Sequence, residues 1–284
     1  FGTSKARATT LLRVLAGVEK PDDGRVYAAS DTRNWQDSIR YVGPSGHNGF
    51  FRALRSILTR ENGNGRQIAE VEDALRSDAE VLCFDDPLHC VEHGRKDAMI
   101  EKIRAAAADK RVIVASSDFE QILRLADRAV VLGEDEIVQA GTPESIYLQP
   151  TASVVAAATG RCNLFGARRL SSSKAEVPEF QSVVGEHRLS IGRTEKSRLG
   201  ALNRNITLAI RPEHVSISFG ASFPEDNLLK AVVIEVRFLG PHTLVKLDAG
   251  GLRLEALVMR LVGLEPGDEC MISMPPDRII LFAG

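Results

Sequence analysis

The sequence predicts two domains of different class: an α/β domain over residues 1–160 and a small all-β domain, of the barrel type, over residues 161–284. In the first part, short apolar runs alternate with helical patterns, which is typical of parallel strands joined by helices. In the second part, alternating runs are separated by turns that contain glycine and proline. A length of 284 residues also fits two domains better than one.

The α/β prediction depends on a strand–helix–strand–helix order in the middle of the first part. Glu80–Phe84 is a short apolar run typical of a buried strand. Gly94–Ala108 has apolar residues at helical spacing, and Arg111–Ala115 is again strand-like. A helix is expected over Asp118–Ala126, with Asp118 as its N-cap. This order predicts parallel pairing of the two strands.

The first part is expected to end in a hairpin and a short helix. Ala129–Leu132 and Glu136–Gln139 have the pattern of two short strands around the turn Gly133–Asp135. Pro143 favours the start of a helix after them.

The all-β prediction depends on alternating runs that recur along the second part. The expected strands are Ile206–Ile210, Lys230–Phe238, Thr243–Leu247, Leu252–Val258 and Glu269–Ser273. The segment Arg161–Arg204 gives no clear pattern.

Composition excludes several classes of protein. Thirty-six basic and 38 acidic residues leave a net charge of -2, so we expect no nucleic-acid partner. The four cysteines are widely spaced, as reduced thiols rather than disulfides would be. No apolar run reaches the roughly 18 residues of a membrane span. The chain opens with Phe1 instead of methionine, which favours a fragment or a processed product.

The first residues have the layout of a phosphate-binding loop that leads into a helix. Such a loop needs glycines that let backbone N–H groups surround phosphate, a lysine, and a hydroxyl for magnesium. Gly2 and Thr9 fit, whereas Arg7 stands at the second glycine position and Ala8 at the lysine position. Taken alone, the pattern fits a polar loop before an amphipathic helix ending at Gly17 better than a phosphate site.

The surrounding segments resemble, in the same order, those of ATP-binding cassette (ABC) proteins. Thr10–Val26 is similar nearly residue for residue to the segment after the phosphate loop in that family. The glutamine loop corresponds to Tyr41–Pro44, and the Walker B region to Asp73–Leu88. Leu125–Leu132 and Ile137–Tyr147 continue the resemblance.

The second part resembles the TOBE domain, an OB-like barrel found on the ATP-binding subunits of importers for sugars, polyamines and ferric iron. The similar segments are Leu208–His214, Phe238–Gly240 and Gly267–Asp268. The two resemblances together imply an α/β P-loop NTPase-like (ABC ATPase) domain followed by an all-β OB-like (TOBE) barrel. The first domain would be incomplete, without its N-terminal strands and most of its helical subdomain.

The resemblance implies ATP and magnesium as ligands, bound weakly or not at all. The positions that would contact nucleotide are Gly2, Ser4, Arg7, Thr9 and Thr10. The positions that would hold magnesium are Thr9 and Asp85.

The resemblance also implies impaired catalysis. Asp86 stands in place of the glutamate that polarises water, and Ser117 in place of the switch histidine. The shorter side chain moves the carboxylate by roughly 1.5 Å, and about 1 Å of misplacement can cost on the order of a hundredfold in rate. Pro44 replaces the glutamine of the Q-loop, and Asn62 the serine of the signature sequence.

The function implied is the ATP-binding (ATPase) subunit of an ABC-type solute importer, which couples ATP binding and hydrolysis to transport. Its partners would be permease subunits, a second copy of the chain and, indirectly, a solute-binding receptor. It would be cytoplasmic and peripheral on the inner face of the cell membrane. The alternative is a non-hydrolysing pseudo-ATPase that acts as a regulatory or interaction module.

Two other interpretations of the acidic and histidine-rich segments remain open. Asp85 and Asp86 also fit acidic residues at a strand end that enters a turn. His89 and His93, near Cys90, share one helix face, as metal ligands do. No paired cysteine spacing accompanies them, so we expect no zinc site.

Overall fold

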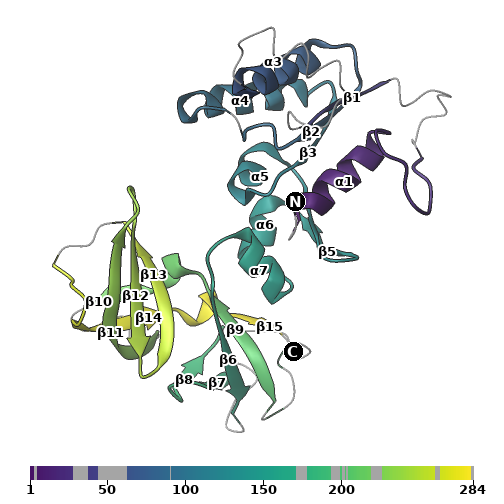
Figure 1. The fold of residues 1–284 in the computed structure, drawn as a ribbon. Helices are drawn as coiled ribbons and strands as arrows, with labels where there is room; N and C mark the ends of the chain where they lie inside the picture. The colour runs from purple at the N-terminus through teal and green to yellow at the C-terminus, as the bar shows by residue number, and fades with distance from the viewer. Residues whose placement is uncertain are drawn as a thin grey trace. The chain divides into compact units, whose positions relative to one another are not determined.

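The structure is a computed structural model that forms two compact units, Phe1–Leu148 and Gln149–Gly284 (Figure 1). The residues that it describes are 1–2, 5–27, 38–43, 63–89, 91–170, 178–192, 199, 202, 204–218, 226–259 and 263–282.

The first unit contains helices packed on a small sheet. Its helices are α1 (Lys5–Leu15), α3 (Gly63–Arg76), α4 (His93–Ala106), α5 (Phe119–Leu125) and α6 (Pro143–Leu148). Its strands are β1 (Ile39–Val42), β2 (Val81–Asp85), β3 (Arg111–Ala115), β4 (Ala129–Leu132) and β5 (Ile137–Gly141).

The sheet of the first unit is parallel, with the strand order β1-β2-β3. This confirms the α/β prediction, and the strands and helices lie close to the ranges that the sequence favours. Asp118 caps α5 as expected, because its Oδ1 accepts a hydrogen bond from the Glu120 N–H at 3.0 Å. Gly17, at φ 70°, follows α1 in the left-handed conformation that ends many helices.

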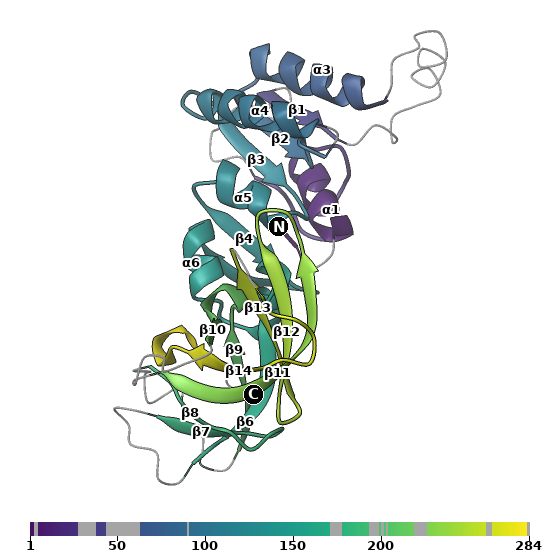
Figure 2. The ribbon, with the colours of Figure 1, turned by 90° about the vertical axis from the view of Figure 1, so that its left-hand side faces the viewer.

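Helices cover both faces of this sheet (Figure 2). On one face, α1 contributes Ala8 and Leu12 to a cluster with Cys83 and Ala115. On the other face, α3 and α4 pack against the alternate residues of β2, whose Leu82 and Phe84 are fully buried. Residues of a strand therefore alternate between the two helical layers.

The hairpin β4–β5 lies beside the first two residues of the chain. Its strands are antiparallel, as predicted. Gly2 forms a parallel bridge with Leu132, and the Leu132 N–H donates to the Phe1 carbonyl at 2.9 Å. Phe1 and Gly2 thus run parallel to β4.

The second unit is built almost entirely of strands. One sheet has the order β15-β9-β6-β7-β8 and the other the order β10-β14-β11-β12-β13. The strands of the first are β6 (Asn163–Arg169), β7 (Glu179–Ser182), β8 (Arg188–Ser190), β9 (Asn205–Ile210) and β15 (Ile280–Phe282). Those of the second are β10 (Ser216–Ser218), β11 (Asn227–Phe238), β12 (Thr243–Ala249), β13 (Leu252–Val258) and β14 (Glu269–Met274). Helix α7 (Ser153–Thr159) and two short 3-10 helices, η3 (Pro212–His214) and η4 (Pro276–Arg278), complete it.

One hydrophobic core joins the two sheets. All the described strand pairs of this unit are antiparallel. Every second residue of β11 from Asn227 to Val233 is buried, and the residues between them are exposed. The OB-like all-β prediction is confirmed, and the five expected strands are all present. The sequence predicts no strand at β6, β7 and β8, because they lie in Arg161–Arg204, where no alternation is evident, nor at the three-residue strands β10 and β15.

Two buried asparagines connect the sheets by hydrogen bonds that imitate a strand ladder. Asn163 donates to the Glu255 carbonyl at 2.9 Å and accepts from the Glu255 N–H at 2.7 Å. Asn227 donates to the Ser190 carbonyl at 2.8 Å and accepts from the Ser190 N–H at 2.6 Å. Each amide therefore satisfies a donor and an acceptor that the sheet geometry leaves at the junction.

Helix α7, which the sequence places in the α/β part, packs with the strands of the second unit. Arg211, only 2% exposed, explains this placement. Its guanidinium donates to the Ala156 and Arg161 carbonyls at 2.8 and 3.1 Å and to Thr159 Oγ1 at 2.8 Å. One buried side chain thus binds the C-terminal end of α7, where helical carbonyls lack partners within the helix.

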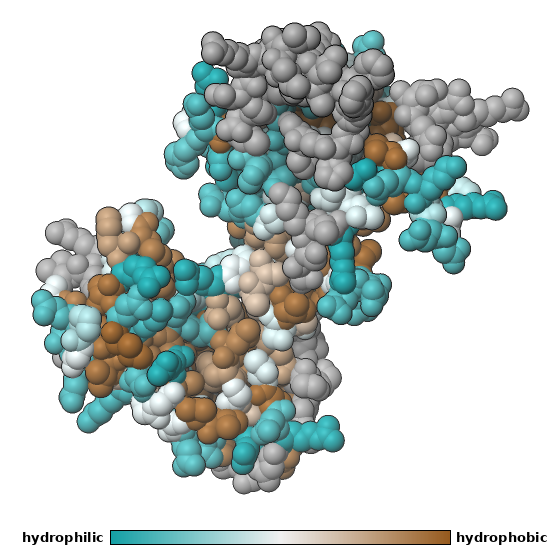
Figure 3. Space-filling view, in the orientation of Figure 1, coloured by the Kyte–Doolittle hydropathy of each residue, from teal (hydrophilic) through white to brown (hydrophobic). Residues whose placement is uncertain are grey.

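Polar and apolar side chains are mixed on the visible face of the second unit (Figure 3).

None of the helices in the described ranges has the length and hydropathy of a membrane span. The described cysteines, Cys83, Cys162 and Cys270, are free thiols. Burial raises the pKa of the Cys83 thiol to about 11, so this residue is a core residue rather than a nucleophile.

Candidate functional site

The candidate site lies where α1 meets the carboxyl ends of β1, β2 and β3. In a parallel sheet these ends share one edge, and ligands commonly bind there. The predicted residues Thr9, Asp85, Asp86 and Ser117 all come from this edge or from α1.

The structure brings the two predicted magnesium residues together. Thr9 Oγ1 donates a hydrogen bond to Asp85 Oδ1 at 3.0 Å, across 76 residues of sequence. Asp85 ends β2 and is 1% exposed. A buried carboxylate beside a hydroxyl fits a magnesium ion, which typically takes one or two carboxylates and completes its shell with phosphate oxygens and water.

Tyr41 is a further member of the site that sequence analysis did not single out. Its hydroxyl donates to Asp85 Oδ2 at 3.5 Å from the neighbouring strand β1. Burial, together with the charge of Asp85, raises the pKa of Tyr41 to about 12. Gly43 leaves room for this ring, because a Cβ there would collide with it. The signal in the sequence is that Tyr41 begins the segment Tyr41–Pro44, which corresponds to the glutamine loop.

Asp86, predicted to stand for the catalytic glutamate, is 3% exposed and has a left-handed backbone at φ 53°. Such a conformation is uncommon outside glycine, and aspartate adopts it more readily than most residues. Gln67 Nε2 donates to the Asp86 carbonyl at 3.2 Å, and the Asp86 N–H donates to the Ala115 carbonyl at 2.7 Å. These bonds fix the turn that follows β2.

Ser116, the neighbour of Ser117, lies beside Asp86. Ser116 Oγ is 3.5 Å from Asp86 Oδ1, and Ser116 is 3% exposed. Ser117 is exposed to solvent. Because residues of an extended segment alternate in direction, a shift of one position moves the hydroxyl from one side of the chain to the other.

At the two substituted positions of the predicted phosphate loop, both side chains already contact other parts of the protein. Ala8, at the expected lysine position, is 6% exposed, and its methyl group packs in the cluster with Leu12, Cys83 and Ala115. Arg7 Nη1 donates to the Gly133 carbonyl at 2.9 Å. That guanidinium is therefore already engaged by the turn between β4 and β5.

Two of the remaining predicted positions, Gly2 and Thr10, lie within the described residues. Gly2 is in the bridge with Leu132, and Thr10 is exposed on α1. Ser4, Pro44, Asn62 and Cys90 lie outside the described residues. In the described ranges, no three histidine, cysteine or acidic side chains group as metal ligands would.

Comparison with known proteins gives matches to both parts of the chain. The sequence profile of the TOBE domain matches residues 208–282. The Fe(3+) ions import ATP-binding protein FbpC 2 of Rhizobium meliloti is 27% identical over 247 residues, which cover 81% of this chain and 60% of that protein. The chain thus spans about three fifths of the length of this relative.

Two further matches extend the comparison. The sulfate/thiosulfate import ATP-binding protein CysA 2 of Chromobacterium violaceum is 26% identical over an alignment that covers all of this chain and 87% of that protein. Among solved structures, the cytoplasmic molybdate-binding protein ModG covers 43% of this chain and 96% of its own, at 17% identity and a TM-score of 0.39.

Proposed function

We propose that this chain is a magnesium-nucleotide-binding subunit of an ABC importer with impaired hydrolysis, on the basis of its similarity to ATP-binding proteins of import systems and of its match to the TOBE domain. The relatives named above are ATP-binding proteins of import systems for ferric iron and for sulfate or thiosulfate. The transported solute differs from one relative to the other, whereas ATP binding is common to both.

The contact between Thr9 and Asp85 is the observation that supports nucleotide binding most directly. A magnesium ion needs a carboxylate that is held in place, and Thr9 Oγ1 lies 3.0 Å from Asp85 Oδ1. Thr9 follows the first turn of α1, and the backbone N–H groups of that turn, residues 5–8, lack partners within the helix and favour anions. Phosphate oxygens bound there would complete the coordination of an ion between Thr9 and Asp85.

The substitutions around this pair support slow turnover. A lysine that reaches the β- and γ-phosphates would give charge-assisted hydrogen bonds of roughly 1.5–3 kcal/mol each, and Ala8 gives none. The Asp86 carboxylate is one methylene shorter than glutamate and lies near Ser116. Since hydrolysis depends mostly on positioning and on neutralised charge, both changes reduce the rate more than they reduce binding.

A second candidate is a non-hydrolysing module that binds nucleotide or a partner for regulation. The burial of Ala8 favours it, because this position belongs to the apolar cluster of α1 and β2. In that case the remaining contact between Thr9 and Asp85 would serve binding alone.

The proposed partners are permease subunits, a second copy of the chain and, through the permease, a solute receptor. The proposed location is the cytoplasmic face of the cell membrane. The second unit, with its continuous core, would be the part that stabilises these associations.

Nucleotide-dependent stability tests the proposal. Magnesium-ATP at millimolar concentration should raise the melting temperature, and ATP with a chelator should not, because the charge of Asp85 acts through the metal. Asp85→Asn should abolish the effect. The matched control is Asp97→Asn, whose carboxylate forms an exposed ion pair with Arg124 on the helical layer. An equal magnesium-ATP response in Asp85→Asn would contradict the proposed site.

Phosphate release from ATP separates the two candidates. Slow release that Asp85→Asn abolishes would support the impaired ATPase. Magnesium-dependent stabilisation without any release would support the non-hydrolysing module.

A further inference from the structure

The two oxygens of the Asp85 carboxylate accept hydroxyl groups from two different elements. Thr9 Oγ1, on α1, donates to Asp85 Oδ1 at 3.0 Å. The Tyr41 hydroxyl, near the end of β1, donates to Asp85 Oδ2 at 3.5 Å. The terminal torsion of an aspartate side chain has a broad energy minimum, so contacts at both oxygens decide how the carboxylate is turned.

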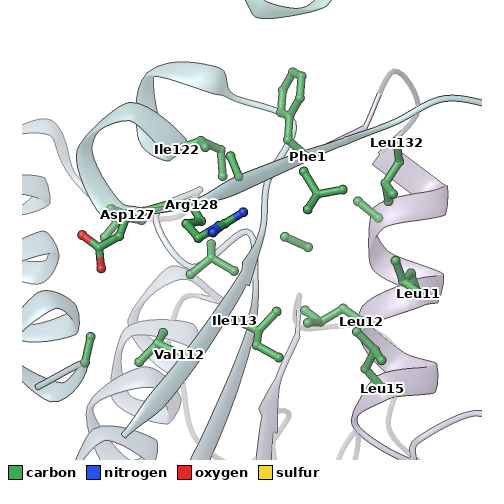
Figure 4. Close-up of a pocket in the computed structure, with 18 of the residues that line it drawn as sticks. Phe1, Leu11, Leu12, Leu15, Val112, Ile113, Ile122, Asp127, Arg128 and Leu132 are labelled. Carbon is green, nitrogen blue, oxygen red and sulfur yellow. The ribbon is translucent and has the colours of Figure 1, made fainter. Parts of the chain in front are cut away.

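The ring of Tyr41 is held between α1 and the sheet. It packs against the apolar cluster that contains Ala8, Leu12 and Cys83, and Cys83 is its partner in the parallel pairing of β1 with β2. Figure 4 shows Leu12 directed from α1 toward the strands. The direction of the Tyr41 hydroxyl toward Asp85 therefore follows from packing as well as from the hydrogen bond.

Gly43 leaves the space in which the Tyr41 hydroxyl lies. A Cβ at this position would collide with Tyr41 Oη and would lie 2.8 Å from the Cε1 and Cζ atoms of the ring. Any other residue would thus force the ring to move. Gly43 is not among the glycines with positive φ, so the position uses its small size rather than its backbone freedom.

The distance between Thr9 Oγ1 and Asp85 Oδ1 fits a small cation. Magnesium takes oxygen ligands at roughly 2.0–2.1 Å in octahedral geometry, which places neighbouring ligands about 2.8–3.0 Å apart. Calcium takes them at roughly 2.3–2.6 Å, which at the same right angle gives about 3.3–3.7 Å. The observed distance of 3.0 Å is that of the magnesium geometry.

We propose that Tyr41 is a positioning residue of the magnesium site and makes this site selective for magnesium over calcium. The inference rests on the proposed function, because it takes the pair of Thr9 and Asp85 as the place of the ion. By holding Oδ2, Tyr41 keeps Oδ1 beside Thr9 Oγ1. Hydrogen-bonded partners of metal ligands typically contribute about tenfold to a hundredfold in metal affinity.

The selectivity follows from the different geometric demands of the two ions. Magnesium requires nearly ideal octahedral angles, so its affinity depends on how the Asp85 carboxylate is turned. Calcium accepts six to eight ligands in flexible geometry, including both oxygens of one carboxylate, so it tolerates a carboxylate that turns. Loss of the Tyr41 contact should therefore weaken magnesium binding more than calcium binding.

Binding of magnesium-ATP and calcium-ATP to the whole chain tests the proposal. The dissociation constants come from the rise in melting temperature with metal-ATP concentration, at constant ionic strength and with the metal in excess over ATP. The readout is the ratio of the calcium-ATP constant to the magnesium-ATP constant. A general loss of structure weakens both complexes and leaves this ratio unchanged.

We expect Tyr41→Phe to weaken magnesium-ATP binding by about tenfold and calcium-ATP binding by less than about twofold, so the ratio falls by about fivefold or more. Gly43→Ala should lower the ratio similarly, because it keeps the hydroxyl but displaces it from Asp85. In the double variant the ratio should fall no further, because both changes remove one contact. Tyr27→Phe is the matched control: Tyr27 is 79% exposed, and the variant should keep the ratio of the unchanged chain.

Two results would overturn the proposal and leave the magnesium site in place. One is a ratio in Tyr41→Phe equal to that of Tyr27→Phe, while circular dichroism shows both variants folded. The other is an unchanged ratio in a folded Gly43→Ala, which would mean that the hydroxyl does not act through Asp85 Oδ2. If Gly43→Ala does not fold, Tyr41→Phe alone decides. An unchanged chain that responds to neither metal-ATP complex would instead refute the proposed function, and this inference with it.

Discussion

The two units of the chain differ in how their buried residues are connected. In the second unit, both five-stranded sheets share one apolar core, and Asn163 and Asn227 bond the sheets to each other. In the first unit, separate clusters occupy the two faces of a three-stranded sheet, and a groove of about 590 Å³ lies open beside it. The second unit is thus held by one core that both sheets share, whereas the first is held by separate clusters on the two faces of its sheet.

The two units also differ in the contacts that individual side chains make. Arg211, in the second unit, uses its buried guanidinium to hold a helix end. Arg7 and Ala8, in the first unit, stand at loop positions that resemble ligand-binding ones but are engaged by Gly133 and by the apolar cluster. The hydrogen bond of Thr9 with Asp85 lies near them and is the contact on which the proposed magnesium site depends.

The largest expected effect is on the shared core of the second unit. Leu208 in β9 is fully buried, so Leu208→Ala should lower the free energy of unfolding by about 2–5 kcal/mol. Leu164→Ala is the matched control on the paired strand β6, where Leu164 is 40% exposed, and it should cost about 0.5 kcal/mol or less. Urea unfolding followed by circular dichroism measures both. Equal losses of unfolding free energy in the two variants would contradict this prediction, because burial in the shared core would then add nothing to stability.

The next effect concerns the bond between the sheets. Asn163→Asp should cost about 1–3 kcal/mol, because a carboxylate would face the Glu255 carbonyl to which the amide now donates. Asn205→Asp is the control, since Asn205 is exposed and accepts from the Arg168 guanidinium. The same unfolding experiment should show little loss for Asn205→Asp. A cost for Asn163→Asp no greater than that of the control would mean that the asparagine bridge is not needed.

The third prediction concerns the filled lysine position. Ala8→Lys should destabilise the first unit by about 1–3 kcal/mol, because a larger side chain must enter a packed cluster. It should also tighten magnesium-ATP binding, by roughly 1.5–3 kcal/mol for each charge-assisted bond gained. Ala8→Met adds bulk without charge and should only destabilise. If Ala8→Lys and Ala8→Met bind magnesium-ATP equally, the loop does not approach phosphate.

The smallest effect is spectroscopic. Tyrosinate absorbance should contain a component near pH 12 that Tyr41→Phe removes, because burial and then Asp85 raise the pKa of Tyr41 to about 12 from 10.0. The folded state holds this proton more tightly, so the contribution of Tyr41 to stability is complete below pH 10 and is lost as the pH rises toward 12. Asp85→Asn should lower the pKa of Tyr41. An unchanged titration in Asp85→Asn would rule out the contact between these side chains.

Sequence patterns predicted most of the fold because they report burial directly. The runs at β2, β3, β9 and β11 to β14 have the apolar periodicity of strands that face a core. The short strands β7 and β8 lack such runs and depend on tertiary contacts such as that of Asn227 with Ser190.

The candidate site was predicted in part. The resemblance to ABC proteins assigns both Thr9 and Asp85 to magnesium, and the structure brings these two side chains into contact. Tyr41 and Ser116 were missed, because only the packing of adjacent strands shows that they face Asp85 and Asp86. The burial of Ala8 also could not be read from a loop pattern, because it depends on how α1 lies on β2 and β3.

Calorimetric titration of the whole chain with magnesium-ATP tests most directly the claim that a cation site persists after most phosphate contacts are gone. We expect a dissociation constant of about 0.1–1 mM, which is a binding free energy between about -5.5 and -4 kcal/mol, and no heat in Asp85→Asn or with a chelator. A dissociation constant of about 1 μM, or titration heats that Asp85→Asn leaves unchanged, would contradict it.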